Sequence, residues 1–233
     1  MALFRYPLDL FIRILVKLQI ILTLLFKSKF SHWFFIAFIL VSFAILSCAE
    51  SDEKKEETKR LSYKNCDFTD IKTGDIVLKR GKGRVSKMIT DYLKEKVPIS
   101  HCGIIIVSPD STYIVHSVAQ GYARKDGVQT ILLKDFLLDC QAHYFYIVRQ
   151  KKADAEREVF ANKAIEFSMT NTPFDDEANN TDKKEMSCTE LIYWCQKDTY
   201  GKSDLTTINF ANKDLFVFNA LLDSTNYNII KHY

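Results

Sequence analysis

The chain has 233 residues, of which 47% are hydrophobic and 26% are charged, and its formal net charge at pH 7 is +3. The first 47 residues hold five basic residues and one acidic residue, a net charge of +4, so the remaining residues carry −1. Because the basic excess lies in the N-terminal segment alone, charge gives no support to a nucleic-acid partner.

The first fifty residues have the pattern of a leader segment. An apolar stretch, 33–46, follows Lys27 and Lys29 and ends in Leu-Ser-Cys48. A charged flank, a short apolar core and small residues at its end predict a secretory signal peptide. The apolar stretch is too short for an ordinary membrane span. An uncleaved signal anchor is the alternative. The ending resembles a bacterial lipobox, which implies that Cys48 becomes the lipidated first residue of the mature protein.

A second apolar stretch, 8–26, is interrupted by Arg13 and Lys17. It is either an extension from a misassigned start or an amphipathic helix on the membrane surface, since the two cations lie four residues apart.

After Cys48 the run AESDEKKEETKR lacks aromatic residues and predicts a solvated tether. Its acidic beginning is similar to surface-export tags on lipoproteins of some didermic bacteria. The remaining residues can form one globular domain with a real core, and no internal repeat or linker divides them. The predicted organisation is a leader at 1–47, a lipidated cysteine and charged linker at 48–62, and a domain at 63–233.

The apolar pattern of this domain predicts clustered strands with flanking helices, which is an α+β fold. Asp154 is expected to cap a long amphipathic helix that ends near Thr170. The other expected elements are a short helix at 85–96 ended by Pro98, strands at about 99–107, 112–119, 128–134 and 144–150, and a helix from Cys188 to about Tyr200.

Two histidines lie on neighbouring predicted strands. His101 interrupts a run that is apolar on both faces, as in a central strand, and a polar ring there must find a partner. If Val107 pairs with Thr112, Gly103 lies opposite His116, and the two histidines share a face as diagonal neighbours about 7 to 8 Å apart. A slip of one residue would separate them. For each histidine alone, a core ring bonded to the backbone is the alternative.

Cys188 lies at a predicted helix start. The residues Ser187 to Glu190 fit the S-x-x-E capping box, which makes Ser187 the N-cap and Cys188 the first helical residue. The thiol would sit at the positive end of the helix dipole, where the thiolate is favoured and unpaired N–H groups can bind an oxyanion. A packing cysteine is the alternative. Together with two histidines on one face, this cysteine favours a nucleophilic triad.

These segments occur in an order that resembles the circularly permuted papain-like cysteine hydrolases of the YiiX type, within the NlpC-like superfamily. The segments that carry the resemblance are GDIVLKR, SHCGIIIV, YIVHS, KDFL, YIVRQ, TPFDDE and SCTELIYW. The histidine precedes the cysteine here, as in the permuted branch, whereas in papain the cysteine comes first. The resemblance implies an antiparallel sheet packed against helices, with the nucleophile at a helix N-terminus.

The resemblance also implies the catalytic roles. His101 corresponds to the base, His116 to the residue that orients it, and Cys188 to the nucleophile. The expected activity is hydrolysis of amide bonds in cell-wall or other small peptides through an acyl-enzyme intermediate, with Phe174 and Asp175 lining the substrate pocket. The third position is often Glu in YiiX-type proteins, whereas a histidine there is similar to the lecithin retinol acyltransferase branch.

That histidine keeps a lipid acyl hydrolase or acyltransferase with the same triad as an alternative. An envelope lipoprotein that keeps the fold for binding without turnover is another. The expected location is the bacterial cell envelope, with a membrane anchor through the N-terminal lipid, a peptide or acyl substrate as partner, and no nucleic acid.

The cysteines remaining after Cys48 are odd in number, so a fully oxidised monomer would keep one thiol. Cys102 and Cys195 are interpreted as core residues. Cys140 and His143 have the spacing of half a zinc site, but no second pair accompanies them. No Walker-type or dinucleotide-binding glycine motif is present either. We therefore expect no metal and no cofactor.

Overall fold

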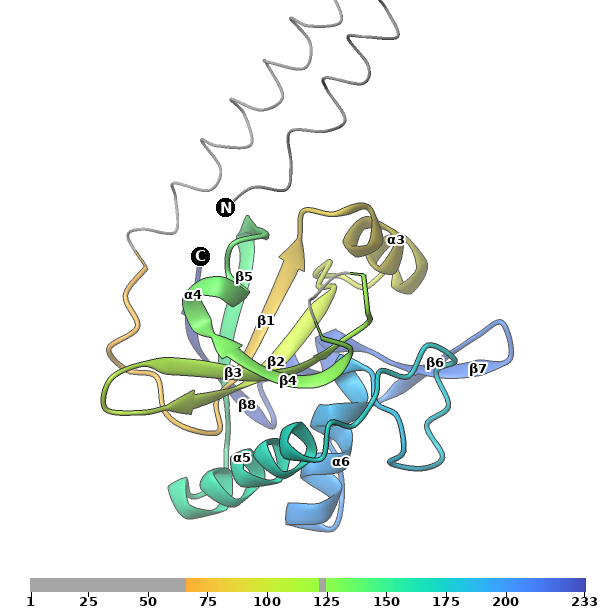
Figure 1. Ribbon diagram of the computed structural model, residues 1–233. Coiled ribbons are helices and arrows are strands. Elements are labelled where there is room, and N and C mark those ends of the chain that lie inside the picture. The colour runs from red at the N-terminus through yellow and green to blue at the C-terminus, as the bar shows by residue number, and fades with distance from the viewer. Residues whose placement is uncertain (1–65, 122–124) are drawn as a thin grey trace, which may run out of the picture. The chain divides into compact units, whose positions relative to one another are not determined.

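The computed structural model describes residues 66–121 and 125–233 (Figure 1). The predicted leader at 1–47, Cys48 and the charged linker at 48–62 lie outside the described residues, as does the predicted start of the domain at 63. None of the helices in the described ranges has both the length and the apolar character needed to cross a membrane.

The central feature is a six-stranded antiparallel sheet with the strand order β4-β3-β2-β1-β5-β8. Its strands are β1 (Ile76–Gly81), β2 (His101–Val107), β3 (Thr112–Val118), β4 (Gly127–Leu132), β5 (Cys140–Gln150) and β8 (Tyr227–His232). A separate ribbon consists of β6 (Thr207–Phe210) and β7 (Lys213–Phe216). The predicted α+β class with an antiparallel sheet is confirmed.

Helices cover the sheet on its two faces. The helical elements are α3 (Arg84–Leu93), α4 (Leu133–Phe136), α5 (Asp154–Met169), α6 (Cys188–Tyr200) and the 3-10 helix η2 (Phe218–Leu222). Helices α5 and α6 lie side by side along one face (Figure 1), and α4 packs on the opposite face against β3 and β4.

Two apolar clusters result from the alternation of side chains along the strands. Cys102 and Ile104 of β2 point to the cluster that contains the buried residues of α5 and α6. Ile105 points to the second cluster, which contains Phe136 of α4. Strand β2 lies between β1 and β3, so the central strand with two buried faces that the sequence predicts is confirmed.

Several element boundaries differ from the prediction. Helix α3 ends at Leu93 because Lys94 adopts a left-handed conformation with φ 50°, before Pro98 is reached. Strand β4 ends at Leu132, where the chain turns directly into α4. The prediction that Asp154 caps α5 is wrong: the N-cap is Ala153, and the Asp154 carboxylate instead accepts hydrogen bonds from Lys72 at 2.8 Å and Arg157 at 2.5 Å.

Four strands were not predicted from the sequence. In β1 the buried apolar run is only three residues long before Lys79 and Arg80. In β8 only Tyr227 is fully buried, so no clear alternation marks this edge strand. The β6-β7 ribbon is largely exposed.

Candidate active site

Cys188 is the first residue of α6, and the predicted capping box is confirmed. Ser187 is the N-cap, and its hydroxyl accepts a hydrogen bond from the Glu190 N–H at 3.3 Å. The buried Glu190 carboxylate accepts one from the Ser187 N–H at 2.8 Å. These two bonds fix the helix start, so the Cys188 thiol lies at the positive end of the helix dipole.

His101 and His116 meet on one face of the sheet. Val107 pairs with Thr112 and Ile104 with Val115, so the predicted register of β2 and β3 is confirmed. The Nε2 atom of His101 lies 2.8 Å from Nδ1 of His116, a hydrogen bond between the two rings. This bond leaves Nδ1 of His101 as the nitrogen available to a thiol.

The surroundings of Cys188 favour the thiolate. A hydrogen bond from the Cys102 side chain, then the charge and the hydrogen bond of His101, hold the pKa of the Cys188 thiol well below its usual value, although burial opposes them. The Cys102 thiol also donates to the Cys188 carbonyl oxygen at 3.2 Å. A partly buried thiolate beside an imidazole is the arrangement that nucleophilic cysteine chemistry requires.

His116 is held neutral. Burial lowers the pKa of this ring well below its usual value, and the charges of His101 and Lys79 lower it further. A neutral ring protonated on Nε2 accepts a hydrogen bond at Nδ1, so it can stabilise a protonated His101. The Nε2 atom of His116 is buried and has no hydrogen-bond partner among the described residues.

Two further residues complete this side of the site, and sequence reasoning missed both. The Phe136 ring stacks on His101 with 5.3 Å between ring centroids and meets His116 edge-on at 5.5 Å. The Lys79 ammonium lies 4.1 Å from the Phe136 centroid and also contacts the Phe136 carbonyl and Asp139. Lys79 lies in GDIVLKR and Phe136 in KDFL, two of the segments that carry the family resemblance, but their composition indicates no role in the site.

The segment 173–186 contains the predicted pocket residues. Asp175 is buried, and its carboxylate accepts hydrogen bonds from the Glu177 N–H at 2.8 Å and the Asn179 N–H at 2.5 Å, both within its own loop. Phe174 is partly buried. Asp175 also interacts with Glu190: burial, and then Asp175, raise the pKa of Glu190 to about 7 against the lowering effect of its hydrogen bonds to Ser187.

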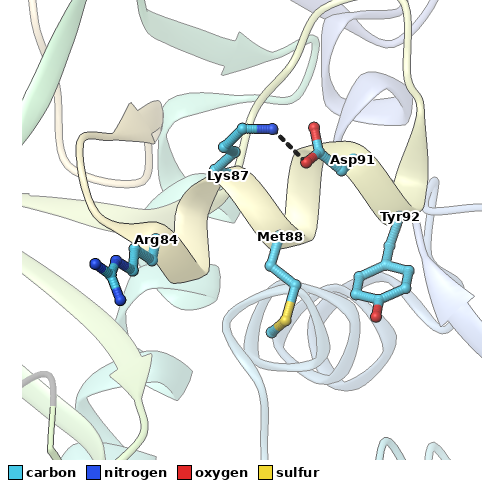
Figure 2. Close-up of a pocket in the computed structure, with 5 residues that line it drawn as sticks. All are labelled: Arg84, Lys87, Met88, Asp91 and Tyr92. Atoms are coloured by element: carbon cyan, nitrogen blue, oxygen red, sulfur yellow. Dashed lines mark hydrogen bonds and ion pairs between the residues drawn. The ribbon is translucent and has the colours of Figure 1, made fainter.

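A shallow hollow of about 420 Å³ lies elsewhere, on the exposed side of α3 (Figure 2). Its lining residues all belong to that one helix: Arg84, Lys87, Met88, Asp91 and Tyr92. Figure 2 shows Lys87 directed toward Asp91, with which it forms an ion pair at 2.6 Å. The hollow shares no residue with the cysteine and histidine cluster.

Comparison with protein families matches residues 70–217 to the family described as permuted papain-like amidase enzyme, YaeF/YiiX, C92 family. The chain belongs to this family. The YaeF/YiiX family is a cysteine peptidase and amidase family, so the chain is a hydrolase of this class, as the sequence predicted.

The chain is similar in structure to the metalloprotein yiiX from Escherichia coli O157:H7, known from a crystal structure. The two share 14% sequence identity with a TM-score of 0.58, over 70% of this chain and 97% of the other. This similarity supports the fold. Comparison with curated proteins gives no significant match.

The described part of this YaeF/YiiX family member contains no group of three or more His, Cys, Asp or Glu side chains that could hold a metal ion. Cys140 is buried in the second apolar cluster, and His143 lies in β5 with a left-handed φ of 68°. Within residues 66–121 and 125–233, the donors therefore do not fit a metal centre.

Proposed function

We propose that this protein is a thiol amidase that cleaves amide bonds in cell-wall or other small peptides, with Cys188, His101 and His116 as its triad. One observation carries the proposal: a cysteine at a capped helix N-terminus lies beside a histidine whose other nitrogen is bonded to a second, neutral histidine. Family membership supports the amidase chemistry.

The reaction begins with attack of the Cys188 thiolate on the carbonyl carbon of the substrate. His101 is the group that holds the thiol proton, and its Nε2–H donates to Nδ1 of His116 in that state. As the tetrahedral intermediate forms, its oxyanion accepts a hydrogen bond from the Cys188 N–H in the first turn of α6.

His101 then protonates the leaving amine, and the acyl group stays on the Cys188 sulfur. Water, activated by the same imidazole, releases the acyl group and restores the thiolate. His116 keeps one orientation and one tautomer of His101 throughout, which is the role of the third residue in such triads.

The location is part of the proposal. We place the protein in the bacterial cell envelope, anchored to a membrane through a lipid on Cys48, with 48–62 as a tether. The predicted signal segment and its Leu-Ser-Cys ending support this location. An envelope anchor suits a peptide substrate of the cell wall, and Phe174 and Asp175 remain the predicted pocket residues.

The histidine pair supports a second candidate. A histidine at the third position is similar to the lecithin retinol acyltransferase branch, and the bond between His101 and His116 gives that position a direct role. The same triad would then transfer or hydrolyse lipid acyl groups. Panels of small peptides and of acyl lipids, assayed with the same enzyme, separate the two substrates.

The decisive experiment is alkylation of Cys188 by an electrophilic probe across pH, in the full chain purified in mild detergent. We expect rapid labelling near neutral pH that maps to Cys188 and falls at least about tenfold in His101→Ala, because the imidazole favours the thiolate. Cys195→Ala, which removes a buried cysteine of the same helix, is the matched control and should label like the wild type.

Labelling no faster than that of a model thiol, and independent of His101, would overturn the catalytic proposal. A lipoprotein that binds without turnover would then be the better description. In the enzyme, Cys188→Ala abolishes product formation, whereas a binding protein would keep its function in that variant.

A further inference from the structure

A second thiol, that of Cys102, contacts the backbone of Cys188. Cys102 is on β2, one residue after His101, and its side chain points to the opposite face of the sheet, toward α6. Its Sγ donates a hydrogen bond to the Cys188 carbonyl oxygen at 3.2 Å, so the Cys102 sulfur lies in contact with the residue that carries the proposed nucleophile. The proposed triad uses no atom of Cys102.

Solvent access differs between these two cysteines. Cys188 is partly exposed, whereas Cys102 has no exposed surface, so a dissolved oxidant can meet only Cys188 directly. Cys195 is also fully buried, but it lies seven residues further along α6, about 10 Å at the rise of an α-helix. Among these three thiols, Cys102 is therefore the one placed to react with an oxidised Cys188.

We propose that Cys102 and Cys188 are a reversible oxidation site: a hydroperoxide oxidises Cys188, and the adjoining Cys102 thiol converts the product to an internal disulfide. The inference rests on the proposed function, since it needs a reactive Cys188 thiolate. It adds a second reaction at the same sulfur, with an oxidant as the co-reactant.

The chemistry balances in two steps. The Cys188 thiolate attacks the terminal oxygen of the hydroperoxide, so that an S–O bond forms, the O–O bond breaks and the sulfur becomes a sulfenic acid. The other oxygen of the hydroperoxide takes up a proton and leaves as the alcohol or water. The Cys102 sulfur then attacks the Cys188 sulfur, and the S–O bond breaks. The Cys102 proton passes to the departing hydroxide, which leaves as water, and the hydroperoxide has accepted two electrons in all.

The disulfide would stop the hydrolase and protect it. With its sulfur in a disulfide, Cys188 cannot attack a carbonyl. It also cannot proceed to the sulfinic and sulfonic acids, which are not restored by thiols. A dithiol reductant would regenerate both cysteines by exchange and restore the nucleophile.

The test treats the full chain in mild detergent with hydrogen peroxide and measures intact mass, tryptic peptides and alkylation of Cys188. We expect the loss of two hydrogen masses, a cross-linked peptide pair containing Cys102 and Cys188, and at least tenfold slower alkylation that a dithiol restores. Cys102→Ala should instead gain oxygen atoms on Cys188 that the dithiol does not remove after longer exposure. Cys195→Ala, the matched buried control, should form the disulfide like the wild type.

The outcomes separate this inference from the proposed function. If Cys188 alkylates rapidly before oxidation but peroxide gives only oxygenated Cys188 in the wild type, the disulfide is overturned and the hydrolase stands. If Cys102→Ala is protected as well as the wild type, Cys102 is not the partner. If Cys188 in the untreated chain alkylates no faster than a model thiol, both proposals fail.

Discussion

His116 can assist His101 only while its own ring is neutral. The ring is 5% exposed, and burial together with the charges of His101 and Lys79 lowers its pKa well below the usual value. A neutral His116 can accept the Nε2–H of a protonated His101 at Nδ1. Burial is the main cause of this lowered pKa, and the charges of His101 and then Lys79 add to it.

Replacing the acceptor therefore distinguishes its role from simple packing. In His116→Leu the His101 imidazolium loses its partner, and we expect Cys188 alkylation near neutral pH to fall by about tenfold. In His116→Asn the amide oxygen lies near the former Nδ1 and can accept the same proton, so most of the rate should return. Alkylation rates across pH test this, with circular dichroism as the folding control. Equal rates in both variants would mean that His116 only fills space.

Some of these site residues could be predicted from sequence patterns, and others could not. The capping box around Cys188 is local, and the histidine pair follows from one assumed pairing across a short turn, so both could be predicted. The contacts of Cys102 with Cys188 and of Phe136 with His101 depend on how α6 and α4 pack on the sheet. Side-chain neighbours of that kind arise between segments far apart in the chain, and no local pattern reports them.

At the scale of the element, the carboxyl groups of Glu190 and Asp175 interact at the start of α6. Glu190 closes the capping box and also interacts with Asp175, which organises the loop 175–179 through backbone N–H groups. Burial and then Asp175 raise the pKa of Glu190 to about 7, despite the hydrogen bonds from Ser187. A protonated Glu190 can donate to Asp175, whereas two ionised carboxylates repel each other.

This raised pKa gives the stability of the protein a defined pH dependence. Between the ordinary value of 4.5 and about 7, the folded chain holds a proton at Glu190 that the unfolded chain releases, so the free energy of unfolding falls as pH rises through this window. Glu190→Gln imitates the protonated side chain, and we expect it to remove this slope and to be more stable than the wild type above pH 7.

Urea denaturation at several pH values measures that difference. Ser187→Ala is the matched control at the same helix start, and loss of its cap should lower the free energy of unfolding by about 1 kcal/mol with the pH slope retained. Because His116 titrates in the opposite sense below its usual pKa, each variant is compared with the wild type at the same pH. An unchanged slope in Glu190→Gln would mean that Glu190 is ionised throughout.

At the scale of the whole molecule, β1 lies between β2 and β5 and so connects two parts of the sheet that are far apart in the sequence. Strands β1 to β4 pair in chain order, but β1 also pairs with β5, and the sheet then continues to β8. Strands β2 and β3, which carry the two histidines, could be predicted from their apolar runs. The position of β1 in the middle could not, because Lys79 interrupts its run and the β1-β5 pairing is long-range.

A buried ion pair ties these two strands together. Asp75, just before β1, has no exposed surface, and its carboxylate accepts two hydrogen bonds from the Arg149 guanidinium of β5, at 2.7 and 2.8 Å. The same carboxylate accepts the Lys72 N–H at 2.8 Å. The pair lies at the opposite end of β1 from Lys79, which is the register partner of His101.

Removing this carboxylate should therefore cost stability without altering the chemistry. In Asp75→Ala the Arg149 guanidinium loses its partner, and we expect the free energy of unfolding in urea to fall by about 3 kcal/mol. Asp91→Ala, which breaks the exposed pair with Lys87 on α3, should change it little. Under conditions where Asp75→Ala is still folded, Cys188 should alkylate at the wild-type rate, because the cysteine and histidine contacts do not involve Asp75. If Asp75→Ala instead lost Cys188 reactivity with its free energy of unfolding unchanged, the ion pair would act on the active site. The inference that the Asp75 end of β1 stabilises the fold while the Lys79 end supports the site would then be wrong.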